Sequence, residues 1–131
     1  MTSRRAQWAF LLVLAVPPTS SLFSGFNTTD GFLNKVLFGE RFAHRRLPEV
    51  DALDPPTRSR DGYDGQFYAQ IAVSPLLRHP DLPRTTRLSY RGRRVGMSMM
   101  AFVLGLVRTA WILQVYSVLN WFFWIALAYG L

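Results

Sequence analysis

The 131-residue chain contains no cysteine, and its final 36 residues carry a single charge, that of Arg108. Without cysteine there is no disulfide framework, no thiolate nucleophile and no thiolate metal site. The two histidines, His44 and His79, are too far apart for zinc-ligand spacing, so no zinc site is expected. A long stretch so poor in charge cannot be hidden in the core of a soluble domain of this size. It indicates a membrane protein.

The positive charge is concentrated in the middle of the chain. A net charge of +7 and a pI near 10.8 would ordinarily point to nucleic acid as a partner. However, all eight acidic residues lie between Asp30 and Asp81, and residues 27–95 hold twelve of the fifteen lysines and arginines. This pattern is a polar segment between two apolar ones, and no nucleic-acid partner is expected.

The first apolar segment follows Arg4 and Arg5 and extends from Trp8 to Phe26. Its 19 residues are close to the roughly 20 that span a hydrocarbon core, so residues 1–26 are predicted to form a transmembrane helix, kinked at Pro17-Pro18. The arginines favour a cytoplasmic N-terminus and place residues 27–95 outside the membrane.

A secretory signal peptide is the alternative for this segment. A cationic start precedes a nine-residue apolar stretch, Trp8 to Val16, and small residues at Thr19-Ser20-Ser21 stand where a cleavage site would lie. Renewed hydrophobicity at Leu22-Phe23 favours the retained helix instead.

Residues 27–95 are expected to form an external loop with short amphipathic helices. Apolar residues recur at helical spacing from Asp30 to Arg46, which predicts a helix with Asp30 as N-cap that ends before Pro48. This helix could lie on the membrane surface or pack on its own protein, and the sequence leaves both open. The prolines and acids from Pro48 to Arg60 predict a linker or irregular loop.

Residues 96–131 are predicted to form a transmembrane helical hairpin. The uncharged run from Thr109 to Leu131 has 23 residues, about 34 Å as a helix, and can cross a bilayer. The run from Val95 to Val107 is shorter, and we favour a turn at Arg108-Thr109 on the cytoplasmic side. A re-entrant half-helix followed by one crossing is the alternative. The predicted fold class is an all-α membrane protein, and the apolar end at Leu131 indicates a fragment of a larger helical bundle.

Two carboxylates and several aromatic residues gather between Arg60 and Ala72. Apolar spacing predicts a short helix that begins at about Gly65, with Asp64 at its N-cap and Asp61 in the preceding turn. Asp64 could simply cap that helix. Alternatively, a carboxylate held near the lipid headgroups could act as a general base or bind a metal that neutralises phosphate.

Five arginines follow within eleven residues, at the start of the next apolar run: Arg84, Arg87, Arg91, Arg93 and Arg94. They could form a basic collar beside a membrane helix. They could also recognise phosphate, because the guanidinium group binds phosphate oxygens in a bidentate manner.

The run from Gly62 to Tyr68, followed by Ile71-Ala72 and by Tyr90-Arg91 with Arg93-Arg94, resembles a known signature. It is similar to the first external loop of bacterial GT-C type polytopic membrane glycosyltransferases, including PIG-V-like mannosyltransferases and cell-surface glycopolymer proteins. Those enzymes use a polyprenyl-phosphate sugar donor and a carboxylate in this loop as catalytic base.

The resemblance implies specific roles for residues of this chain. Asp64 would be the base, with Asp61 second, and Arg91, Arg93 and Arg94 would bind the donor phosphate, with or without a divalent metal such as Mg²⁺ or Mn²⁺. Tyr63, Gln66 and Tyr68 would contact substrate. Asn120 also matches a position where such proteins often carry asparagine.

The match covers residues 60–125 and has departures. Val73-Ser74-Pro75 stands where an Asp-Pro pair is expected, Ser98 stands in place of a proline, and such transferases have many more membrane helices. The resemblance implies the function of a glycosyltransferase, or of its N-terminal piece because of these departures, in cell-surface glycan assembly at the bacterial inner membrane. The alternative is a non-catalytic integral membrane protein whose basic loop binds anionic lipid or a partner protein.

Overall fold

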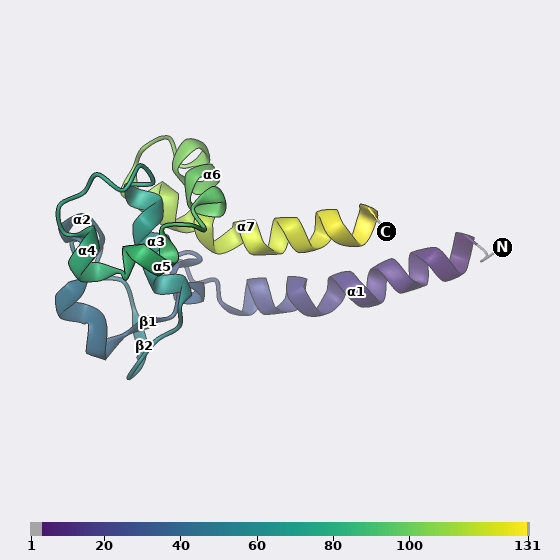
Figure 1. Ribbon diagram of the computed structural model, residues 1–131. Coiled ribbons are helices and arrows are strands. Elements are labelled where there is room, and N and C mark those ends of the chain that lie inside the picture. The colour runs from purple at the N-terminus through teal and green to yellow at the C-terminus, as the bar shows by residue number, and fades with distance from the viewer. Residues whose placement is uncertain (1–3, 131) are drawn as a thin grey trace.

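The computed structural model describes residues 4–130 and is mostly helical (Figure 1). Two long helices, α1 (Arg4–Ser24) and α7 (Thr109–Gly130), extend side by side from a group of shorter elements. We call residues 25–108, together with the first turns of α7, the head, and we call α1 and α7 the helical pair. The pair is antiparallel, so the N-terminal end of α1 and the C-terminal end of α7 lie at the same end of the molecule, away from the head.

The two helices of the pair are joined by indole hydrogen bonds. Trp121 Nε1 donates to Thr19 Oγ1 at 3.1 Å, and Trp124 Nε1 donates to the Leu14 carbonyl at 2.9 Å. Helix α1 continues through Pro17 and Pro18. Because Pro18 has no N–H, the Leu14 carbonyl four residues earlier has no helical donor. The Trp124 indole supplies one from α7.

One described helix is long and apolar enough to cross a membrane by length and composition, over Thr109–Leu127. The apolar part of α1, Trp8–Ser24, is a shorter segment. The predicted helix after Arg108 is therefore present, and Leu131, on which the expectation of a fragment rested, lies outside the described residues.

The predicted hairpin of two crossing helices is not confirmed. Helix α6 (Gly96–Leu104) has only nine residues, about 14 Å of rise, and it packs against α3 and the start of α7. Leu106 and Val107 then adopt left-handed backbone angles, φ +52° and +61°, which end the helical run before Arg108. The turn is thus at the head end of α7, opposite to the end that carries Arg4.

Helix α3 (Gly65–Val73) is the central element of the head, and its predicted start at about Gly65 is confirmed. It contacts α4 (Leu82–Thr85), α6 and α7, and most of its side chains are buried. Ile71 and Ala72 are fully enclosed with Leu47, Leu82 and Leu113 in the hydrophobic core. The site residues that precede α3 are therefore joined directly to a helix that is buried in the core.

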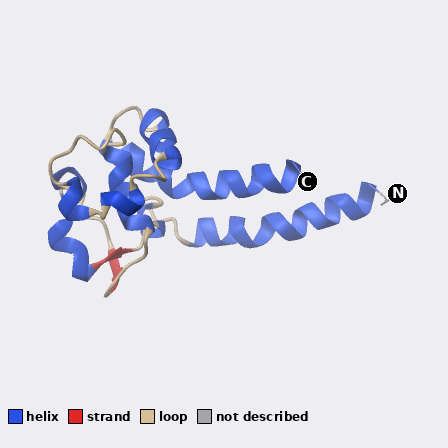
Figure 2. Ribbon diagram, viewed as in Figure 1, coloured by secondary structure: helices blue, strands red, loops and turns tan. Residues whose placement is uncertain are grey.

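The predicted continuous helix from Asp30 to Arg46 is wrong. The segment forms a 3₁₀ helix η1 (Leu33–Lys35), a strand β1 (Phe38–Gly39) and a second 3₁₀ helix η2 (Glu40–Arg45). Leu37 has a left-handed φ of +53°, which no α-helix accommodates. Strand β1 pairs in parallel with β2 (Thr57–Ser59), and Figure 2 shows both strands in red.

Asp30 is not the cap of that segment, and the linker after Pro48 is not wholly irregular. The Asn27 side chain accepts hydrogen bonds from the N–H groups of Thr29 and Asp30. Pro48 opens the short helix α2 (Pro48–Asp51), a position where its missing N–H has no cost. A last short helix, α5 (Leu88–Arg91), leads into α6.

Amide side chains, buried or partly buried, connect loops to helices. Gln114 of α7 accepts a hydrogen bond from Phe32 N–H and donates to the Asp30 carbonyl, both at 2.7 Å. Gln70 of α3 accepts from Leu47 N–H at 2.8 Å. These bonds satisfy backbone groups that lie outside regular structure, so the irregular segments of the head are fixed to its helices.

Candidate functional site

A cavity of about 410 Å³ lies at the N-terminal end of α3. It is bordered by the turn before α3, by η2 and by the segment from α4 to α5. Its charged lining residues are Arg45, Asp61, Asp64, Arg84, Arg87 and Arg91. Four arginines against two carboxylates leave a surplus of two positive charges, which favours an anionic ligand.

Asp64 occupies the N-cap position of α3 but makes no capping hydrogen bond with its side chain. Its Oδ1 instead accepts a hydrogen bond from Arg91 Nη2 at 2.7 Å. The Asp64 side chain is 56% exposed. The capping interpretation thus fails on geometry, and the carboxylate lies accessible at the cavity with an arginine beside it.

Arg91 is the most firmly held cation of the cavity. Its side chain is 14% exposed, and its guanidinium carbon lies 4.0 Å from the centre of the Phe67 ring. This stacking and the ion pair to Asp64 fix the planar guanidinium group, while its Nε has no hydrogen-bond partner among the described residues. That Nε is itself buried, so the guanidinium group meets the cavity from a fixed position beside Asp64.

Asp61 belongs to the turn that precedes α3. It forms an ion pair with Arg41 at 3.3 Å, and both side chains are largely exposed. In the same turn Gly62 has φ +66°, and a Cβ there would clash with the backbone of Gly39 and Leu37. The close approach of this turn to β1 brings the Asp61 side chain to the edge of the cavity.

The three residues expected to contact substrate are placed differently. Tyr63 is exposed and lines the cavity, as a substrate-contacting residue must. Gln66 also lines it, but its amide accepts from Gly39 N–H and donates to the Asp61 carbonyl, both at 3.0 Å, so it holds the turn in place. Tyr68 packs against the hydrophobic core and does not line the cavity.

The arginine cluster divides between the cavity and the open surface. Arg91 lines the cavity, whereas Arg93 and Arg94 are exposed and do not. Arg94 lies over the Tyr90 ring, with 5.5 Å to its centre. Arg84 and Arg87 take part in the lining instead. Helices α4 and α5 are two separate turns, and their orientation could not be read from sequence spacing.

A second cavity, of about 580 Å³, shares Arg45, Arg84 and Thr85 with the first. Arg46 lines this second cavity with a side chain that is only 6% exposed, and it lies over the Phe38 ring at 5.1 Å. Burial lowers the pKa of the Arg46 guanidinium, and Asp51, 3.8 Å away, opposes that shift. The two cavities together form a basic cleft along one side of the head.

The described residues offer no ready metal site. Among them, no three His, Cys, Asp or Glu side chains are grouped so that they could hold an ion. Asp61 and Asp64 are each paired with an arginine, and His79 is paired with Glu49 at 3.1 Å. The described residues of this site therefore do not fit a divalent metal bound by this chain alone.

Asn120 lies on α7 and does not line either of these cavities. The resemblance singled it out for its position, which is in the helical pair and away from the cavity at α3. Comparisons of the chain with families of proteins, with curated proteins and with solved structures found no match.

Proposed function

We propose that the chain forms the catalytic first loop and adjoining helices of a membrane glycosyltransferase of the lipid-linked-sugar, GT-C type. One observation carries this proposal: the Asp64 carboxylate does not cap α3 but lies accessible in a cavity bordered by arginines. A general base and a phosphate-binding group side by side are what transfer from a sugar phosphate requires. The sequence resemblance around residues 62–68 gives the reaction class.

The apolar surface of the helical pair supports a location in a bilayer. Large apolar side chains of both helices are more than half exposed, among them Trp8, Leu12 and Val13 of α1 and Trp111 and Leu127 of α7. An exposed apolar surface that extends along two helices is unfavourable in water. With Arg4 on the cytoplasmic side, the N-terminal end of α1 and the C-terminal end of α7 would both face the cytoplasm. The head and its cavity would then face the outside.

In the proposed reaction, Arg84, Arg87 and Arg91 bind the phosphate of a polyprenyl-phosphate sugar. Binding draws Arg91 from Asp64 toward the phosphate, which leaves the carboxylate free to accept a proton. The acceptor hydroxyl oxygen attacks the anomeric carbon and gives its proton to Asp64. A new carbon–oxygen bond forms, the bond to the phosphate oxygen breaks, and polyprenyl phosphate leaves with the electron pair. The arginines stabilise the charge that develops on this leaving group.

The test compares Asp64→Asn with Asp61→Asn. Asparagine cannot accept a proton at neutral pH, so we expect Asp64→Asn to lower sugar transfer by about 10² to 10⁴-fold, as is typical of losing a general base. Asp61→Asn should retain most activity, because Asp61 is an exposed partner of Arg41 at the cavity edge. The measurement is transfer from a polyprenyl-phosphate donor in membranes that contain the chain at matched protein levels.

Folding serves as the control in this experiment. Asp64 makes no cap bond, its own side chain is 56% exposed, and an asparagine oxygen can still accept a hydrogen bond from Arg91, so Asp64→Asn should change the free energy of unfolding by no more than about 1 kcal/mol. Unchanged transfer in Asp64→Asn, at normal protein levels, would remove Asp64 as the base. Unchanged transfer in both variants would leave the motif as a turn that positions α3.

A further inference from the structure

A third cavity, of about 320 Å³, lies between α1 and α7 beneath the head. Its polar lining residues are Ser21, Lys35, Ser117 and Asn120, and the rest of the lining consists of Pro18, Leu22, Trp121 and Trp124. Lys35 is the one charged residue in this lining. The cavity shares no residue with the arginine-lined cavity at α3.

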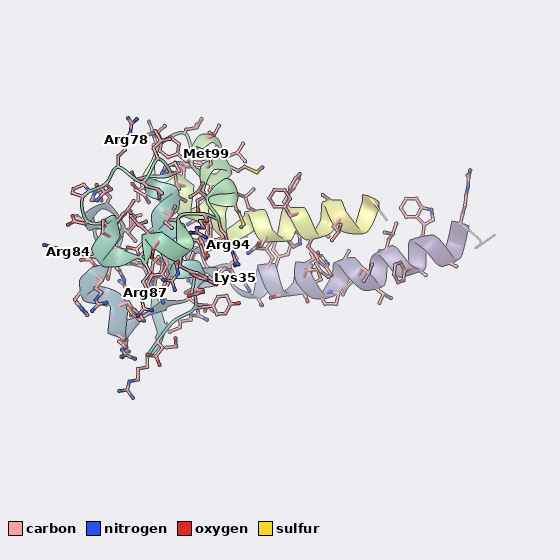
Figure 3. All side chains as sticks on the ribbon, in the orientation of Figure 1. Lys35, Arg78, Arg84, Arg87, Arg94 and Met99 are labelled. Carbon is pink, nitrogen blue, oxygen red and sulfur yellow. The ribbon has the colours of Figure 1, made fainter. Side chains whose placement is uncertain are left out.

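Lys35 reaches this cavity from η1, and Figure 3 shows it beside the junction of α1 with the head. Its side chain crosses Gly25, where a Cβ would overlap Cδ and Cε of the lysine. Its Nζ donates to Ser21 Oγ at 3.3 Å. Within the described residues Lys35 has no acidic partner, so its ammonium group has donors available for an anion.

The other polar groups of the cavity can add to such a site. The Asn120 side chain has no hydrogen-bond partner among the described residues, and Ser21 presents a hydroxyl next to Lys35. Trp121 and Trp124 use their indole N–H groups to bind α1, so their rings form fixed walls. The result is a cationic niche with apolar walls, which matches a lipid headgroup joined to its acyl chains.

The position of the cavity along the helices agrees with headgroup depth. Ser21 and Pro18 lie three and six residues before Ser24, the last residue of α1, which is about 5 to 9 Å by helical rise. Tryptophan and lysine are the residues that concentrate at the membrane–water interface. If the pair crosses a bilayer, this cavity opens at the level of the outer headgroups.

We propose that the cavity lined by Lys35, Ser21 and Asn120 binds the phosphate of an anionic phospholipid. This inference rests on the bilayer location in the proposed function, but not on the transfer reaction. The lipid phosphate accepts hydrogen bonds from Lys35 and the neighbouring polar groups, and its acyl chains follow the exposed apolar surface of α7. A lipid held there anchors the base of the head at a fixed depth.

The test uses the protein in bilayer nanodiscs made from equal amounts of phosphatidylglycerol and phosphatidylcholine. Native mass spectrometry then measures the ratio of the two lipids that stay bound after release. We expect the parent to retain phosphatidylglycerol over phosphatidylcholine by about fivefold, the factor for one lysine–headgroup interaction of about 1 kcal/mol.

Four variants separate the niche from general charge. Lys35→Met should abolish the preference, and Lys35→Arg should keep it. Gly25→Ala retains the charge but displaces the flexible end of Lys35, so it should also weaken the preference. Arg78→Gln is the matched control, because Arg78 is an exposed cation that Figure 3 shows on the side of the head away from the helices. It should leave the ratio unchanged.

The lipid ratio can overturn this proposal in several ways: a parent without preference, an unchanged ratio in Lys35→Met, or an equal loss in Arg78→Gln. If inorganic phosphate at millimolar concentration abolishes the preference, the cavity is a site for free phosphate, and the proposal of a lipid ligand is refuted. Extraction of the parent by alkaline carbonate would refute the bilayer location itself. A change in the lipid ratio without extraction would refute only the lipid site, so the two failures can be told apart.

Discussion

The head and the helical pair distribute their polar and apolar groups in opposite ways. In the head, Leu47 and Ile71 are fully buried, and the ion pair between Arg41 and Asp61 lies at the surface. In the pair, large apolar side chains face outward, while the hydrogen bonds of Trp121 and Trp124 lie between the helices. Polar groups that face inward under an apolar exterior are typical of helices surrounded by lipid. The comparison supports the proposal that the pair lies in a bilayer and the head outside it.

The largest difference in stability is expected when a leucine is replaced by alanine in each region. Leu47→Ala removes a fully buried side chain from the head and should lower the free energy of unfolding by about 2 to 5 kcal/mol. Leu12→Ala alters a residue of α1 that is mostly exposed, and it should change this quantity by less than about 0.5 kcal/mol. Thermal unfolding in detergent measures both. Equal losses would mean that α1 is packed as tightly as the head.

An inserted charge tests the solvent around the pair directly. Leu12→Arg should reduce stable insertion by about 2.5 to 3.5 kcal/mol if α1 lies in the hydrocarbon core. Leu76→Arg is the matched variant in the head, where Leu76 has a similar exposure but lies outside the proposed bilayer, and it should have no effect. Resistance to alkaline carbonate extraction reports insertion. Full resistance of Leu12→Arg would contradict the bilayer location of α1.

The smallest effect concerns the hydrogen bond from Trp124 to the Leu14 carbonyl. Trp124→Phe should destabilise the pair by about 0.6 to 1 kcal/mol, as is usual for a hydrogen bond between membrane helices. In a Pro18→Ala background, Ala would supply the helical N–H to that carbonyl, so the same change should cost much less. Thermal unfolding of the four proteins gives the coupling. If Trp124→Phe costs the same stability in the parent and in the Pro18→Ala protein, the effect of Trp124 comes from packing of its ring and not from the hydrogen bond.

The sequence predicted well those elements that depend on local signals. The start of α3 at Gly65 and the start of α7 after Arg108 are both confirmed, since apolar spacing and a charged or turn residue define each boundary. The segment from Asp30 to Arg46 had helical spacing as well. It failed because β1 pairs with β2 about twenty residues later, and periodicity within a segment carries no information about such a partner.

The candidate site was predicted in part for the same reason. Asp61, Tyr63 and Asp64 do line one cavity, as their proximity to the start of α3 suggested, and Arg91, which the resemblance singled out, lines it too. Arg84 and Arg87 were noted only as members of a basic cluster, because the turns of α4 and α5 decide which arginines face inward. The roles of Gln66 and Gln70 were missed. Two glutamines four residues apart on a helix of apolar residues are the signal that could have indicated buried hydrogen bonds.

The bond between Trp124 and Leu14 joins residues that are separated by 110 positions. Chains are synthesised at roughly 5 to 20 residues per second, so Trp124 emerges about 5 to 20 s after Leu14. During that interval Pro18 leaves the Leu14 carbonyl without its helical donor. The residues of the head are synthesised during this interval, before the partner of the Leu14 carbonyl exists. Packing of α7 against α1 is therefore a late step of biosynthesis. Only then does Trp124 supply the hydrogen-bond donor that the Leu14 carbonyl of α1 lacks.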